Sequence, residues 1–117
     1  MNNSISDGMT GSEKEVEDYL RKLMLIYLYE QPVFVTDDKD RPRIWTPDFY
    51  LPELGIYIEV CGTKKFDYDF REKIYEKNNT PIIFIHQYKN PAEWQGWLKK
   101  EIIRIHKERE KKVNGLE

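Results

Sequence analysis

Residues 45–61 constrain the fold of this chain more than any other stretch. They hold most of two short runs rich in aromatic and β-branched residues, 44–51 and 56–61, a composition typical of β-strands. The residues between the runs, 52–55, are Pro-Glu-Leu-Gly and favour a turn. The sequence therefore predicts a β-hairpin at this point.

A turn centred between Glu53 and Leu54 sets the register of this hairpin. The facing pairs are then Tyr50 with Tyr57, Phe49 with Ile58 and Asp48 with Glu59. Directly opposed residues have Cβ atoms about 4.5–5.5 Å apart, and like charges so placed repel. A shared proton or a divalent cation such as Mg²⁺ would relieve the repulsion, whereas a water-exposed acidic face would need neither.

The two-residue period of a strand assigns the side chains of 56–61 to two faces. Ile56, Ile58 and Val60 point to one face of the hairpin. Tyr57, Glu59 and Cys61 point to the other, so Cys61 is expected on the face that carries the acids.

The acids stand in a recognisable string: Pro47-Asp48, ten intervening residues, then Glu59-Val60-Cys61. This string resembles the motif of the PD-(D/E)xK nuclease superfamily. The stretch from Thr46 to Gly62 is most similar to its very-short-patch-repair-like and group-I-intron-type endonucleases, and the resemblance extends over about residues 12–88. It implies an α/β, restriction-endonuclease-like fold of order αβββαβ, with a mixed four-stranded sheet flanked by helices. A C-terminal helix is expected in addition.

The resemblance also implies a function, a Mg²⁺-dependent (or Mn²⁺-dependent) DNA endonuclease that hydrolyses phosphodiester bonds in DNA repair or restriction. Asp48, Glu59 and the carbonyl of Val60 would hold the metal. Glu13, at the head of the apolar stripe of the first helix, would join them directly or through water, with Glu17 as second choice.

One position departs from the superfamily motif. Its lysine is replaced by Cys61, and a neutral thiol does not supply a positive charge. Lys64, Lys65 or Lys73 would have to take over that role. The alternative is a catalytically inactive protein of nuclease fold that binds nucleic acid or scaffolds a partner.

The rest of the chain predicts the elements around this hairpin. An amphipathic helix is expected over 13–24, with Ser12 as N-cap and Glu15 completing a capping box. A bent strand is expected over 25–36, paired with the strand that carries Asp48. A helix at 66–78, with Phe66, Phe70 and Ile74 on its apolar stripe, should lead into a buried parallel strand at 81–85.

The last helix is expected over 91–112, with Trp94 and Trp97 on its apolar side. Residues 99–112 carry seven Lys or Arg against three Glu, which is enough for a local phosphate-contacting face. The net charge of −2 argues against a nucleic-acid-binding surface that covers the whole molecule. Tyr68, Arg71 and Tyr75 are more typical of surface helix residues than of substrate contacts.

The length of 117 residues fits one domain over 12–112, with a disordered tail at 1–11 and a second tail at 113–117. A single cysteine excludes an internal disulfide and a multi-cysteine zinc site. Residues 1–8 do not show the basic and apolar regions of a signal peptide, and no apolar run reaches membrane length, so a cytoplasmic location is expected. DNA is the expected partner, and a small nuclease of this kind would need to read DNA structure, form a homodimer or work beside a protein that supplies specificity.

Overall fold

The computed structural model describes residues 8–62, 67–89 and 91–115. Its elements, in chain order, are α1 (Gly11–Lys22), β1 (Leu28–Tyr29), β2 (Val33–Thr36), β3 (Pro42–Trp45), β4 (Phe49–Leu51), β5 (Ile56–Val60), α2 (Tyr68–Lys77), β6 (Ile82–Ile85) and α3 (Trp94–Asn114). Four of the strands form one sheet in the order β1-β4-β5-β6. β4 is antiparallel to β1 and β5, and β6 is parallel to β5, so the predicted mixed four-stranded sheet is confirmed.

The β4–β5 hairpin has the predicted register. Phe49 faces Ile58 and Tyr50 faces Tyr57, with the two tyrosine rings 4.4 Å apart between centroids. The turn closes where the backbone N–H groups of Leu54 and Gly55 both donate to the carbonyl of Leu51. Gly55 has a φ of 65°, which a residue without Cβ adopts at no steric cost.

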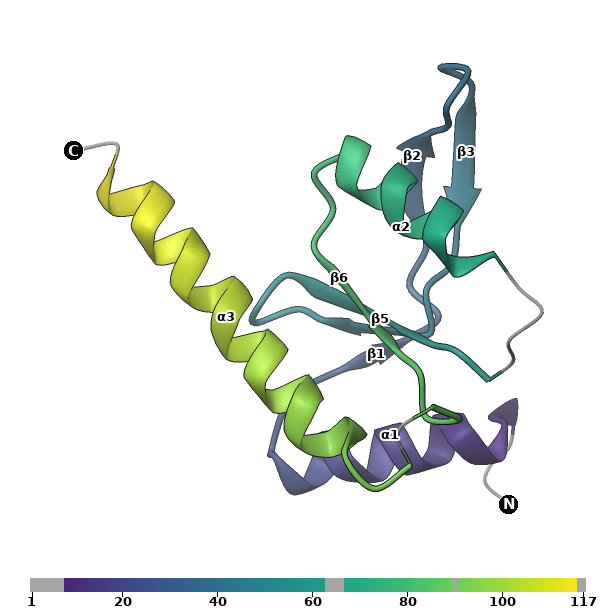
Figure 1. Cartoon of the computed structure of the whole chain (residues 1–117), viewed down its shortest axis with the longest axis vertical. Helices are drawn as coiled ribbons and strands as arrows, with labels where there is room; N and C mark the ends of the chain where they lie inside the picture. The colour runs from purple at the N-terminus through teal and green to yellow at the C-terminus, as the bar shows by residue number, and fades with distance from the viewer. Residues whose placement is uncertain (1–7, 63–66, 90, 116–117) are drawn as a thin grey trace.

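The bent strand predicted at 25–36 is divided into β1 and β2, and the prediction of a single strand at 44–51 is wrong, because β3 ends before β4 begins. Glu30 takes a positive φ of 56° and Pro32 follows it, which separates β1 from β2. Pro47, which has no N–H to donate, separates β3 from β4 in the same way. The outer halves pair with each other instead, and the β2–β3 hairpin stands out from the main sheet beside α2 (Figure 1).

Helices cover both faces of the sheet (Figure 1). On one face α1 and α3 pack on the sheet through a core that includes Val16, Leu20, Phe49, Leu51, Ile56, Ile58, Ile83, Ile85, Trp94 and Leu98. On the other face lie α2 and the β2–β3 hairpin, with a smaller core of Val35, Cys61, Ile74, Tyr75 and Phe84. The predicted two faces of β5 are confirmed, and Cys61 is a fully buried member of the second core.

α1 begins earlier than the sequence predicted. Its N-cap is Thr10, not Ser12: the Thr10 hydroxyl accepts from the N–H of Glu13, and the Glu13 carboxylate accepts from the N–H of Thr10. Met9 is buried in the larger core, so ordered packing starts before residue 12.

The buried face of α2 also differs from the prediction. Ile74 and Tyr75 are its buried residues, whereas Phe70 is exposed and Phe66 lies outside the described residues. Tyr75 is therefore a core residue and not a surface residue. In α3, Trp94 is buried and Trp97 is largely exposed, and no helix in the described ranges is long and apolar enough to cross a membrane.

Candidate functional site

The hairpin and α1 bring together the acids that the sequence singled out. Asp48 lies directly before β4, and its carboxylate accepts a hydrogen bond of 2.7 Å from the N–H of Val60. Glu59 directly precedes Val60 near the end of β5, and strand alternation puts its side chain on the same face as Cys61, which packs with Ile74 and Tyr75 of α2. The start of β4 and the end of β5 thus place both acids at one end of the sheet.

Glu13 reaches this acidic cluster from the first turn of α1. Its carboxylate accepts from the Thr10 N–H at 2.9 Å and from the Tyr29 hydroxyl at 3.2 Å, and it shares a hydrogen bond with the carboxyl group of Asp48. Two carboxyl groups hydrogen-bond only when one of them is protonated. Glu13 therefore lies beside Asp48, and its role at a metal stays a prediction, while Glu17 is buried elsewhere and accepts from Tyr27 at 2.6 Å.

The electrostatics of the cluster favour protonation. Burial, the hydrogen bond with Glu13 and the charge of Glu59 raise the pKa of Asp48 to about 8, against the opposing effect of the Val60 N–H. Burial also raises the pKa of Glu59 to about 7, although the charge of Arg71 lowers it. Burial acts on Glu13 in the same direction, but its hydrogen bonds outweigh that effect and lower its pKa. These acids do not all ionise near pH 7 unless a cation compensates them.

One oxygen of Glu59 marks where such a cation would bind. Its Oε1 is buried and has no hydrogen-bond partner among the described residues. An unpartnered buried carboxylate oxygen is costly, and metal coordination is one of the ways in which proteins satisfy it.

The donor set fits Mg²⁺ better than a metal that requires an all-protein cage. Within the described ranges, no three His, Cys, Asp or Glu side chains are arranged so that they could hold a metal ion together. Mg²⁺ needs only one or two carboxylates, because it keeps several waters. Asp48 and Glu59 supply two, and the Val60 carbonyl points to the same edge of β5 as its N–H, towards Asp48. Glu13, already held by Thr10 and Tyr29, is placed for contact through water.

The proposed lysine substitutes have different positions. Lys64 and Lys65 lie outside the described residues. Lys73 is exposed on α2, two residues after Arg71 and therefore about 200° around the helix from it. The Cys61 thiol is fully buried, and burial raises its pKa, so it stays neutral.

Arg71 is a cation that acts on Glu59, whereas the sequence favoured it as a surface helix residue. Its charge opposes the rise in the pKa of Glu59, and its guanidinium stacks 4.8 Å from the ring centroid of Trp45. Trp45 in turn meets the ring of Tyr75 edge-on at 5.3 Å. The signal in the sequence was a charged residue at helical spacing from an apolar one, since Arg71 stands three residues before Ile74. The position of Glu13 beside the apolar stripe of the first helix is a signal of the same kind.

A further polar residue at this end of the sheet was also missed. Gln87 follows β6, is 7% exposed, and donates from its amide to the carbonyl of Ser12 at 3.3 Å and to Glu15 at 3.0 Å. Since β5 and β6 are parallel, their carboxyl ends lie at the same edge of the sheet. Gln87 therefore fixes the start of α1, and with it Glu13, beside the acids.

The basic residues of α3 are partly engaged within the protein. Arg104 pairs with Glu101 and Glu108 at 3.0 Å each, and Arg109 donates to the carbonyls of Leu54 and Gly55. The predicted phosphate-contacting face therefore rests on the remaining lysines of this helix and stays a prediction.

Comparison with known proteins identifies the fold. No family model and no curated protein matches the chain. Among solved structures, the catalytic domain of the homing endonuclease I-Bth0305I is similar, with a TM-score of 0.56 and 17% sequence identity. The similarity covers 83% of this chain and 98% of that domain. The chain therefore has a nuclease fold, the one seen in that catalytic domain.

Proposed function

We propose that this protein is a metal-dependent endonuclease that hydrolyses phosphodiester bonds in DNA. The observation that carries the proposal is the cluster of Glu13, Asp48 and Glu59. The pKa values of Asp48 and Glu59 are raised, and one buried oxygen of Glu59 has no hydrogen-bond partner among the described residues. Such a cluster is costly unless it has a function. The nuclease fold supports DNA as the substrate, since the similar domain belongs to a homing endonuclease.

Asp48, Glu59 and the Val60 carbonyl would hold Mg²⁺ or Mn²⁺, which supplies a bound water of lowered pKa and positive charge at the scissile phosphate. The Val60 N–H holds the Asp48 carboxylate in its ligating orientation. Glu13, oriented by Thr10 and Tyr29, accepts a proton from water near Asp48.

Arg71 would act in place of the missing motif lysine. Stacking on Trp45 fixes its guanidinium on the α2 side of Glu59, where its charge stabilises negative charge that develops on the phosphate. Lys64, Lys65 and Lys73 remain candidates for orienting the attacking water.

A plasmid-nicking assay tests the proposal. With Mg²⁺ or Mn²⁺, the wild type should nick supercoiled DNA and leave 5′-phosphate ends, and Glu59→Gln should lower the rate by about a hundredfold or more. Asp38→Asn removes one exposed acid of the β2–β3 turn and serves as the matched control, with unchanged nicking. Nicking by Glu59→Gln at the wild-type rate would rule out this site.

The second candidate is a nuclease-fold protein that binds nucleic acid or a partner without cleaving. The neutral, buried Cys61 at the lysine position favours it. It predicts that DNA binding persists, without nicking, in the wild type and in Glu59→Gln alike. Three finer proposals are a very-short-patch-repair-like activity, a homodimer and a protein partner that supplies specificity. Comparing the nicking rates of mismatched and matched duplexes tests the first, and sedimentation tests the homodimer.

A further inference from the structure

β6 is an edge strand with an open side. In the order β1-β4-β5-β6 it pairs only with β5, and no other strand of the described ranges meets its second edge. The carbonyls of Pro81 and Ile85 accept from the N–H groups of Tyr57 and Cys61 on the β5 side. Since the backbone groups of successive strand residues alternate in direction, Ile82 and Phe84 direct theirs away from the sheet.

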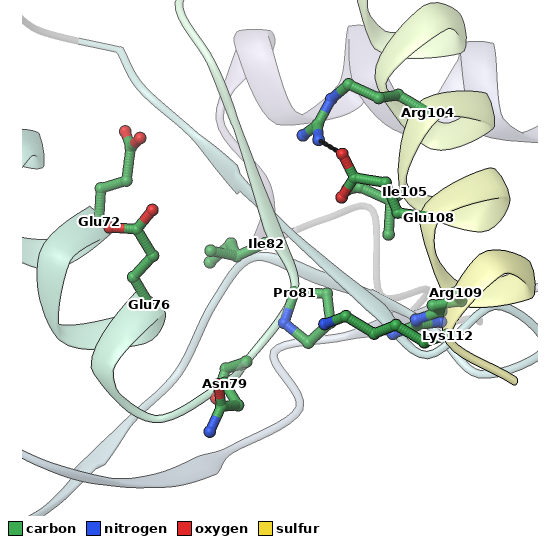
Figure 2. A pocket seen from close by; sticks show the side chains of 11 residues that line it. Glu72, Glu76, Asn79, Pro81, Ile82, Arg104, Ile105, Glu108, Arg109 and Lys112 are labelled. Atoms are coloured by element: carbon green, nitrogen blue, oxygen red, sulfur yellow. Dashed lines mark hydrogen bonds and ion pairs between the residues drawn. The ribbon is translucent and has the colours of Figure 1, made fainter. Parts of the chain in front are cut away.

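A groove runs along this open edge, between α2 and α3 (Figure 2). Its widest part has a volume of about 450 Å³, and adjoining cavities of about 260 and 120 Å³ continue it past Phe84 towards His86. We name it the edge groove and define it by Glu72, Glu76, Ile82, Phe84, Trp97 and Arg104. It is widest at the start of β6, at the opposite end of the strands from the acidic cluster.

The two walls of the edge groove differ in charge. The α2 wall carries Glu72 and Glu76, both exposed and both without an ion-pair partner among the described residues. On the α3 wall Arg104 is neutralised by Glu101 and Glu108, while Arg109 and Lys112 leave this wall with a net positive charge at the wide end of the groove (Figure 2). The groove thus offers open backbone groups between an acidic α2 wall and an α3 wall of net positive charge, so only the side chains of an added strand that face α2 meet Glu72 and Glu76. A small apolar pocket lies at its far end.

We propose that the edge groove binds an extended peptide segment of a partner protein, which adds to the sheet as a strand beside β6. Main-chain hydrogen bonds to Ile82 and Phe84 would give affinity, and alternate side chains would give specificity. Glu72 and Glu76 are one helical turn apart, about 6 Å, close to the roughly 6.6 Å between alternate residues of a strand. The segment therefore carries Lys or Arg at two alternate positions, followed by an apolar residue that enters the pocket of Phe84, His86 and Trp97.

Charge argues against a second copy of this chain as the occupant. Two β6 strands paired antiparallel about a twofold axis would bring each α2 wall beside its counterpart. Glu72 and Glu76 would then meet the same acids of the other copy, and like charges so placed repel. A basic peptide instead complements them, and its binding is independent of any nuclease activity.

Fluorescence anisotropy with a labelled peptide tests the proposal. The probe is fluorescein-Thr-Lys-Thr-Lys-Thr-Leu-Thr, titrated with the full chain at low salt. Binding should weaken by about tenfold in the double variant Glu72→Gln/Glu76→Gln, since each exposed ion pair contributes a few-fold. The control Asp38→Asn/Glu53→Gln removes two exposed acids outside the groove and should bind as the wild type does.

The backbone requirement separates strand addition from simple charge attraction. Two N-methylated versions of the peptide, one for each set of alternate residues, remove the N–H groups that would face β6 or face away from it. One version should fail to bind and the other should bind normally, and amide exchange at Ile82 and Phe84 should slow in the complex. Equal binding of both versions, no binding of the parent peptide, or a wild-type dimer that the peptide dissociates would each overturn the proposal.

Discussion

Replacing Asp48 with asparagine should stabilise the metal-free protein at alkaline pH. The new amide would still accept from the Val60 N–H and would donate to Glu13, but the substitution removes the charge that the site disfavours. The ordinary pKa of 3.8 and the value of about 8 differ by a free energy of about 6 kcal/mol as an upper limit, at about 1.36 kcal/mol per pKa unit. Because Asp48 is only half-buried, solvent screening should leave about 2 kcal/mol.

The pH dependence of this effect has a defined sign. The native protein holds the Asp48 proton more tightly than the unfolded chain does. The contribution of Asp48 to the free energy of unfolding is therefore fully present below about pH 4 and is lost as pH rises towards 8. In EDTA, the Tm of Asp48→Asn should exceed that of the wild type by about 8 °C at pH 8 and by nothing at pH 4. Asp38→Asn, the charge-matched control, should track the wild type.

Metal should reverse this order. Saturation with Mg²⁺ or Mn²⁺ at about 100 times the Kd should raise the stability of the wild type by about 2.7 kcal/mol and that of Asp48→Asn much less. A metal-free Asp48→Asn protein that is less stable than the wild type at pH 8 would refute the view that the acids repel one another.

Three further predictions concern other contacts. Arg71→Ala should lower the nicking rate by about a hundredfold, as for loss of one transition-state donor, whereas Lys73→Ala should leave it within about twofold if Arg71 is the acting cation. Asn78→Ala removes the acceptor of the Thr36 N–H at 2.8 Å and a donor to the Thr36 carbonyl, and urea unfolding should show a loss of about 2–3 kcal/mol. The backbone N–H of Arg41, with further donors, holds the pKa of Asp37 well below its usual range, so its stabilisation is present above about pH 4 and lost below it. The Tm of Asp37→Asn should therefore fall below that of the wild type at pH 7, and the gap should narrow towards pH 2; a constant gap would contradict the ion pairs.

The β4–β5 hairpin was predictable because two independent signals agree on it. The alternation of Ile56, Ile58 and Val60 fixes the faces, and the turn ending at Gly55 fixes the register. The parallel pairing of β6 was predictable for a similar reason, since a helix intervenes between two apolar strands. The expectation that Asp48 lies close to Glu59 followed from the register of the β4–β5 hairpin alone.

Other features depend on choices that local sequence leaves open. The sequence offers two overlapping capping boxes, Thr10 with Glu13 and Ser12 with Glu15, and the structure forms the first, with Met9 packed into the core. The break after β1 involves the positive φ of Glu30, which strand composition does not reveal. The place of Arg71 beside Glu59 depends on how α2 lies over the sheet, and no spacing along the chain encodes that distance.

The β4–β5 turn also makes one surface loop intolerant of length changes. Loops of this kind usually accept insertions at little cost. Here a single added residue between Leu51 and Ile56 would change the parity of β5 relative to β4 and send the Glu59 side chain into the apolar core beneath α1. Arg109 donates to the Leu54 and Gly55 carbonyls and so ties this turn to α3, and an insertion would also disrupt these hydrogen bonds. In a random insertion library, residues 52–55 should therefore be depleted as strongly as buried positions.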